Sequence, residues 1–152
     1  MPTITPFLWY DTQAEEAMNF YLSIFKEGKS LNVTRVNGKV ISATFEMLGQ
    51  KFIALNAGPM YKFNEAVSFF VSCDTQAEVD ELWEKLSEGS SKGRCGWLKD
   101  KFGLSWQIIP KALGELMGDP DPIKSSAVVQ AMMKMNKIVI DDLKNAHAGK
   151  AA

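Results

Sequence analysis

Hydrophobic and polar positions in the first part of the chain predict a strand, a helix and three further strands. The aromatic and apolar run Ile4–Tyr10 is typical of a strand that is buried on both faces or lines a cavity. Apolar residues at helical spacing follow, and this helix is expected to end near Gly28. Alternating segments then predict strands at residues 31–36, 40–48 and 51–56, with tight turns at Asn37-Gly38 and Gly49-Gln50.

The same order of elements restarts after the loop Gly58–Glu65. Residues 66–73 predict a strand, and Val79, Leu82, Trp83 and Leu86 form the apolar stripe of a helix. The Gly/Ser-rich stretch EGSSKGRCG precedes Trp97-Leu98-Lys99, and a turn then leads into the strand LSWQIIP, which Pro110 ends. The second unit is therefore predicted to repeat the first, with a weak middle strand.

The stretch DTQAE occurs twice, at Asp11–Glu15 and at Asp74–Glu78. Thr followed three residues later by Glu predicts a capping box, in which each of the two side chains accepts a backbone N–H of the other residue. At the same offset of 63 residues, Phe7-Leu8 aligns with Phe70-Val71. We therefore interpret DTQAE as the helix start of a tandem structural repeat rather than as a pair of catalytic carboxylates.

The last part of the chain predicts two helices. A short helix is expected at Ala112–Met117, and a longer one from Lys124 to about His147. One face of the longer helix carries five apolar residues: Val128, Met132, Met135, Val139 and Leu143. A flexible partner-binding surface is one use of such methionines, but packing on the domain or at a homodimer interface is favoured.

Composition excludes several classes of function. The 152 residues carry a formal net charge of -1, so the concentrated positive field that nucleic acid or an acidic membrane surface requires is absent. No apolar run approaches the roughly 20 residues that cross a bilayer, and the N-terminus does not resemble a signal peptide. Two cysteines, Cys73 and Cys95, do not form a disulfide framework, so a cytoplasmic protein with reduced thiols is expected.

Three segments together resemble a known family: ITPFLWYDTQAEEAMNFYLSIF, AVSFFVSCDTQAEVDELWEKLSEG and RCGWLKDKFGLSWQIIP. They are similar to the PhnB-like family, also labelled 3-demethylubiquinone-9 3-methyltransferase, of the vicinal oxygen chelate (glyoxalase, bleomycin resistance and dioxygenase) superfamily. The resemblance implies an α+β fold in which two βαβββ modules form a curved mixed sheet around a cavity. We expect one domain over residues 1–150, with modules at about 3–57 and 66–110 and a helical tail at about 111–147. It also implies a symmetric homodimer.

In enzymes of that superfamily, His and Glu side chains on inward-facing strand positions hold a divalent metal. The resemblance places these positions at Thr5, Ala54 or Asn56, Ser68 and Gln107. All are neutral, and His147 in the tail is the single histidine of the chain. Because divalent cations need anionic oxygen or imidazole ligands, neither a metal nor another cofactor is expected.

The same strand positions suggest a pocket for a small apolar or aromatic ligand, with polar groups that orient it. The candidate residues are Thr5, Phe7, Trp9, Asn56, Ser68, Phe70, Cys95, Trp97 and Gln107. Thr5, Ser68 and Gln107 could equally be satisfied polar groups that bond to each other and to buried water. Cys95, beside Arg94, could be an activated nucleophile, although a small buried thiol is the commoner case.

Three functions follow as hypotheses. The favoured one is a metal-free, small-molecule-binding protein of the family. The second is a metal-dependent lyase or dioxygenase of the superfamily that uses other ligands. The third is the methyltransferase of the family label, although no Gly-rich turn joins a strand to a helix as nucleotide-like cofactors usually require.

Overall fold

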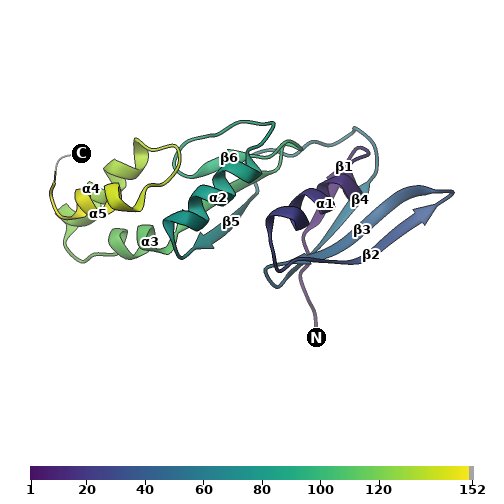
Figure 1. Ribbon diagram of the computed structural model, residues 1–152, viewed down its shortest axis with the longest axis horizontal. Helices are drawn as coiled ribbons and strands as arrows, with labels where there is room; N and C mark the ends of the chain where they lie inside the picture. The colour runs from purple at the N-terminus through teal and green to yellow at the C-terminus, as the bar shows by residue number, and fades with distance from the viewer. Residues whose placement is uncertain (151–152) are drawn as a thin grey trace. The chain divides into compact units, whose positions relative to one another are not determined.

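The computed structural model describes residues 1–150, and the chain divides into two compact units. The first unit is Met1–Phe63 and the second begins at Asn64. Each unit has its own sheet, of four strands in the first and three in the second (Figure 1). The predicted α+β class is therefore confirmed.

The first unit has the predicted order of elements. They are β1 (Phe7–Tyr10), α1 (Ala14–Ile24), β2 (Lys29–Val36), β3 (Lys39–Met47) and β4 (Gln50–Asn56). The sheet order is β1-β4-β3-β2, in which β1 runs parallel to β4 and the other pairs are antiparallel. Helix α1 provides the crossover that a parallel pair needs.

Both hairpins of this unit have two-residue turns. Asn37 and Gly38 have φ values of 51° and 77°, and Leu48 and Gly49 have values of 50° and 77°. This is the conformation of the tight turns that match the twist of antiparallel strands. The second turn begins one residue earlier than predicted, because Leu48 completes the apolar alternation of the strand and leucine rarely adopts positive φ.

Helix α1 covers one face of the first sheet. Its buried residues pack over the strand residues Leu8, Tyr10, Ala43, Phe45, Phe52 and Ala54. The other face of β1 is open, since Phe7 is 57% exposed and Trp9 is partly exposed. The strand expected at residues 4–10 begins at Phe7, and Ile4 is 92% exposed. Of the two alternatives for this strand, burial on both faces was wrong, and the lining of a cavity stays a prediction.

The second unit contains β5 (Ser68–Cys73), α2 (Gln76–Leu86), β6 (Trp97–Lys99) and β7 (Ser105–Pro110). The sheet order is β5-β7-β6, with β5 parallel and β6 antiparallel to β7. The predicted middle strand between α2 and β6 is reduced, in the described chain, to the isolated bridge Lys92–Leu98. The second module is therefore βαββ and not βαβββ, because the Gly- and Ser-rich stretch has little strand propensity.

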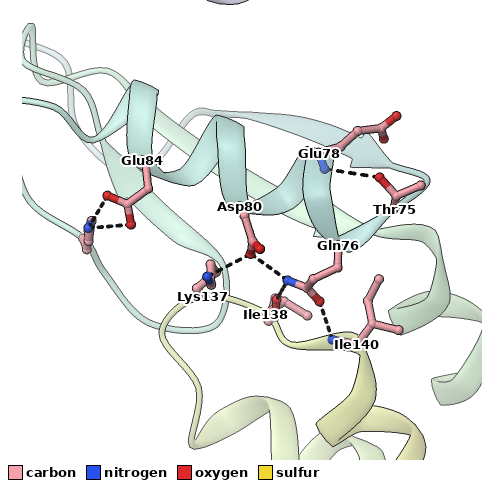
Figure 2. Close-up of polar contacts among 9 residues, drawn as sticks. Thr75, Gln76, Glu78, Asp80, Glu84, Lys137, Ile138 and Ile140 are labelled. Carbon is pink, nitrogen blue, oxygen red and sulfur yellow. Dashed lines mark hydrogen bonds and ion pairs between the residues drawn. The ribbon is translucent and has the colours of Figure 1, made fainter.

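The two DTQAE stretches begin their helices differently. In the second, the Thr75 hydroxyl accepts from the Glu78 N–H at 3.2 Å (Figure 2). The Glu78 carboxylate accepts from the Asp74 N–H at 2.7 Å. This is the predicted capping box with its return bond moved by one residue. The first box was predicted wrongly, because the residue that precedes α1 is Gln13 and its side chain makes no capping bond.

The tail forms three helices: α3 (Lys111–Met117), α4 (Pro122–Met133) and α5 (Ile140–His147). The single long helix predicted from Lys124 to His147 was wrong, because the chain leaves the helix at Lys134. The backbone carbonyls of Met135 and Asn136 accept the N–H groups of Cys95 and Gly96 at 2.9 and 2.8 Å. Those bonds to another segment replace the helical ones.

The tail packs against the end of β7 through α3. Figure 1 shows α3, α4 and α5 next to one another in the second unit. Its hydrophobic cluster consists of Ile109, Leu113, Val128, Ile138 and Leu143, with Met132 and Met135 packed beside them. Of the predicted stripe, Val128 and Leu143 are thus core residues of the second unit. None of the helices in residues 1–150 has the length and apolar character to cross a membrane.

Candidate functional site

The pairing register of the second sheet places six candidate side chains on one face. Ser68 lies opposite Ser105, Phe70 opposite Gln107, Trp97 opposite Gln107 and Lys99 opposite Ser105. Residues on the other face are buried beneath α2, among them Val71, Cys73, Leu98, Trp106 and Ile108. We call the first set, Ser68, Phe70, Trp97, Lys99, Ser105 and Gln107, the open face of the second sheet.

Two of the sequence-predicted residues bond to each other on this open face. The Gln107 side-chain amide donates to the Ser68 hydroxyl at 2.9 Å. Both residues are partly buried, whereas Phe70 on the neighbouring position is 59% exposed. The structure therefore brings Ser68, Phe70, Trp97 and Gln107 together on one sheet.

A pocket of about 310 Å³ adjoins this face. Its lining includes Trp97, Lys99, Ser105 and Glu65. Lys99 forms an ion pair with Glu65 and hydrogen-bonds to it, which holds the pKa of the Glu65 carboxyl below its ordinary value. The Ser105 hydroxyl is buried and has no hydrogen-bond partner within residues 1–150.

Sequence reasoning missed Lys99 and Ser105 as site residues. Lys99 is one of several lysines in a polar turn region, and Ser105 lies in an otherwise apolar strand. Their two-residue alternation with Trp97 and Gln107 was the available signal, since it places all four on one face. The ion pair with Glu65 joins residues far apart in sequence, and no local pattern predicts it.

The two cysteines have different surroundings. Cys73 is 1% exposed, and burial together with the charges of Glu78 and Asp74 raises its pKa to about 11. Cys95 is partly exposed and has a φ of 56°, which is uncommon for any residue other than glycine. The neighbouring Arg94 guanidinium donates to the Met133 carbonyl at 3.1 Å. Arg94 thus has a defined contact in the tail.

The first unit carries three of the candidates at or near β1. Phe7 and Trp9 alternate onto the open face of its sheet, and Thr5 lies two residues before the strand, partly exposed. The Trp9 indole N–H donates to the Gly58 carbonyl at 2.9 Å. Its ring meets Tyr61 edge to face, with centroids 4.9 Å apart. Trp9 is therefore held in place by the loop that follows β4.

Asn56 lies on the opposite side of the first sheet, in register with Tyr10. Its side-chain oxygen accepts the Ala14 N–H at 2.8 Å, and its amide donates to the Val40 carbonyl at 3.2 Å. Asn56 thus caps the first turn of α1 at the Ala14 N–H, whereas Thr12 was expected to cap it at the Glu15 N–H. Its alternative, Ala54, is fully buried on the same side.

Asp100 is a buried carboxylate that sequence reasoning treated only as part of a turn. It is 1% exposed, and one oxygen accepts the N–H groups of Phe102 and Leu104 at 2.9 and 3.0 Å. The other oxygen accepts the Trp106 indole N–H at 2.9 Å. Asp100 therefore fixes the turn between β6 and β7 and with it the strands of the open face.

The metal of the superfamily's enzymes does not fit the residues present here. Asn56 uses its oxygen for the Ala14 N–H, and Thr5, Ser68 and Gln107 offer neutral oxygens alone, which bind a divalent cation weakly. Within residues 1–150, no three His, Cys, Asp or Glu side chains are grouped to hold a metal ion.

The fold identifies the class of protein. The chain has the α+β architecture of the glyoxalase and bleomycin resistance proteins. The fosfomycin resistance protein FosX from Listeria monocytogenes is similar in fold, with a TM-score of 0.50 and 11% identity over 69% of this chain and 87% of that one. A Pseudomonas aeruginosa protein, PA1353, is 20% identical with a TM-score of 0.61, over 72% and 98% of the two chains.

Within that class, residues 2–109 match the family model of 3-demethylubiquinone-9 3-methyltransferase. The chain belongs to this family. It is 34% identical to the PhnB protein of Bacillus cereus, with a TM-score of 0.68, over 72% of this chain and 99% of that one. No curated protein sequence matches the chain.

Proposed function

We propose that this family member binds a small organic ligand on the open face of its second sheet. The observation that carries the proposal is the hydrogen bond at 2.9 Å from the Gln107 amide to the Ser68 hydroxyl. In the register of the sheet, Gln107 lies between Phe70 on β5 and Trp97 on β6. Ligand sites commonly combine apolar and aromatic walls with a few fixed polar groups. The bond to Ser68 orients the Gln107 amide, whose carbonyl oxygen is then available to a ligand donor.

Phe7 and Trp9 support a similar role for the open face of the first sheet. Phe7 corresponds to Phe70 in the repeat and is comparably exposed, at 57% against 59%. Thr5 corresponds to Ser68 and completes the set that we propose for the first unit. Asn56 is left out, because both ends of its amide already bond within that unit.

Binding without a reaction accounts best for the groups present. A general base working near neutral pH needs a pKa near that pH, which a carboxyl reaches when its pKa is raised and a thiol when its pKa is lowered. The pKa of Glu65, beside the pocket, is instead lowered by Lys99. The turns that lead into α1 and α2 contain Asp, Thr and Gln and no glycine, so we do not extend the methyltransferase activity of the family label to this chain.

A fragment screen would test the proposal. Ligands found by ligand-observed NMR should shift the backbone or indole signals of Phe70, Trp97 and Gln107. Gln107→Ala should weaken their binding by about tenfold, since one orienting hydrogen bond is lost. Gln130→Ala, on the exposed side of α4, is the matched control and should leave affinity unchanged. Shifts confined to other surfaces, or equal affinities for both variants, would overturn the proposal.

The homodimer and the single-domain arrangement that the resemblance implies remain proposals. The PhnB-like family and the exposed apolar residues of both sheets, such as Phe7 and Phe70, support the dimer. Sedimentation equilibrium of the full chain would decide it. A single species at the monomer mass, 16.9 kDa, across the concentration range would argue against a dimer.

A further inference from the structure

We propose that the open face of the second sheet contains a carboxylate-binding subsite, in which Lys99 holds the acidic group of the ligand. In the absence of ligand, the Lys99 ammonium pairs with the carboxylate of Glu65, which belongs to the same unit. This inference rests on the proposed function and specifies its ligand class as small carboxylic acids with a flat apolar body.

The position of Lys99 places a cation beside an aromatic side chain. Lys99 and Trp97 lie two residues apart on β6 and therefore on the same face of the sheet. The backbone of Lys99 is fixed by its N–H bond to the Ser91 carbonyl at 3.1 Å and by pairing with Ser105. An acid whose carboxylate meets Lys99 can thus lay its apolar part against Trp97.

Glu65 already shows which chemical group Lys99 accepts. Its carboxylate pairs with the Lys99 ammonium, and both side chains are substantially exposed, at 59% and 40%. Exposed ion pairs contribute little to stability, so a ligand carboxylate can replace this one at small cost. Glu65 precedes β5 by three residues and belongs to no helix or strand, so its side chain can swing away without disturbing the sheet.

The Ser105 hydroxyl is a second and independent indication of a ligand. It lines the same pocket, is buried, and makes no hydrogen bond within residues 1–150. Buried hydroxyls nearly always have a partner, because leaving one unpaired costs free energy. In register Ser105 lies between Ser68 and Lys99, so its hydroxyl can donate a hydrogen bond to a carboxylate on Lys99 once Glu65 has moved.

The size of the pocket limits the ligand. At about 310 Å³ it is at the small end of the range for ligand pockets, roughly 300 to 1,000 Å³. A benzoate-sized acid suits this volume. Benzoate and its neutral isostere benzamide therefore make a matched pair of probes, because they differ in charge and hardly in shape.

The experiment titrates both probes into five proteins and follows the Trp97 indole signal by NMR. The proteins are wild type, Glu65→Gln, Lys99→Met, Ser105→Ala and Glu84→Gln. Glu84 is the control, because its pair with Lys92 is also an exposed ion pair of the second unit, at 2.9 Å, but lies away from this pocket. Urea unfolding of each variant shows whether it remains folded.

The subsite predicts a specific set of changes. Glu65→Gln should bind benzoate about two- to fivefold more tightly than wild type, since an exposed competing ion pair is removed. Lys99→Met should bind the two probes equally, and Ser105→Ala should lose benzoate affinity by about threefold without loss of stability. Glu84→Gln should match wild type, and added salt should weaken benzoate and not benzamide.

The outcomes separate this inference from the proposed function. If wild type binds benzamide as well as benzoate, and Glu65→Gln changes neither affinity, the carboxylate subsite is wrong while binding at the open face stands. If a loss in Ser105→Ala is matched by a loss of stability, its hydroxyl is structural and not a ligand contact. If neither probe moves the Trp97 signal in wild type or in Glu65→Gln, both proposals fail.

Discussion

Thr12 and Thr75 occupy the same place in the two DTQAE stretches but have different contacts. Thr75 is extended, with φ at -127° and ψ at 160°, and its hydroxyl caps α2. At the start of α1, the side-chain oxygen of Asn56 accepts the Ala14 N–H instead. Glu15, the counterpart of Glu78, pairs with Arg35 at 2.6 Å. A capping motif thus gives way where another strand supplies an acceptor.

A matched pair of substitutions tests this difference. Thr75→Ala should lower the free energy of unfolding by about 1 kcal/mol, because it removes an N-cap acceptor. Thr12→Ala removes the same atoms from the same motif. It should change the free energy of unfolding by less than about 0.5 kcal/mol, as for an ordinary surface position. Urea unfolding followed by far-UV circular dichroism measures both. Equal losses in the two variants would show that Thr12 caps α1 in solution.

At the scale of elements, the tail is an addition to the family domain that is tied closely to it. The family model ends at residue 109, and α3, α4 and α5 follow. The Gln76 amide donates to the Ile138 carbonyl at 3.0 Å and to Asp80 at 2.9 Å, and its oxygen accepts the Ile140 N–H at 2.7 Å (Figure 2). Lys137 pairs with Asp80 at 2.8 Å beside it. One glutamine at the first turn of α2 therefore anchors the start of α5.

Gln76→Ala should loosen the tail. It leaves the Ile138 carbonyl and the Ile140 N–H without their partner, and we expect a loss of about 2 kcal/mol, as for other partly buried hydrogen bonds. Hydrogen exchange should speed up in α5 and at Cys95 and Gly96, which bond to the tail, while α1 exchanges as before.

Gln130→Ala, at an exposed site on α4, is the control and should leave all protection unchanged. Faster exchange in the first unit after Gln76→Ala would contradict the local role of this residue. Unchanged exchange at α5 would show that the hydrophobic cluster alone holds the tail.

The elements that periodicity could predict are those whose contacts lie within one unit of the repeat. Both first strands, both helices and both hairpins of the first unit were predicted, because alternation and helical spacing report directly on a covered and an open face. The end of helix α4 at Lys134 could not be predicted, because the Met135 and Asn136 carbonyls accept the N–H groups of Cys95 and Gly96, some 40 residues earlier in the chain. The middle strand of the second unit was correctly expected to be weak, but its replacement by a single bridge was not.

The candidate site was predictable to a similar extent. Alternation and the repeat placed Ser68, Phe70 and Gln107 on one face, and the structure joins Gln107 to Ser68. Trp97 was a candidate whose face the pattern did not fix. Asn56 was placed by an alignment that could slip by two residues. A shift of two residues leaves the side chain on the same face of the strand, so both Ala54 and Asn56 lie on the side of the sheet that α1 covers. Alternation could have placed Ser105 on this face, but the lack of a hydrogen-bond partner for its hydroxyl within residues 1–150 is recorded by no sequence pattern.

At the scale of the whole molecule, charged groups and a buried thiol define the pH range of stability. The pKa values of Asp80 and Asp119 are lowered, the first mainly by Lys137 and the second mainly by the Asp121 N–H and then by His147. A lowered folded pKa contributes stability above the ordinary value, here 3.8, that is lost as the pH falls through the folded value. Acid should therefore weaken the second unit, where both groups lie.

The alkaline limit belongs to Cys73. Its pKa is raised by burial from 9.0 to about 11, so the thiol is neutral in both the folded and unfolded states near pH 7. Above pH 9.0 the Cys73 thiol ionises first in the unfolded chain. This ionisation lowers the free energy of the unfolded chain relative to the folded one. The resulting loss should reach on the order of 2 kcal/mol as the pH approaches 11.

Cys73→Ala isolates this effect, because alanine cannot ionise. The variant should be less stable than wild type at pH 7, since a buried side chain is shortened, yet its free energy of unfolding should fall less between pH 9.0 and 10.5. Urea unfolding at half-unit pH steps gives both slopes. Lys111 also has a raised pKa, from its bond to Asp74, and contributes stability that is lost only above 10.5, so the comparison stops there. Identical slopes for the two proteins would mean that Cys73 ionises as readily in the folded chain as in the unfolded one, and that the core of the second unit admits solvent at this strand.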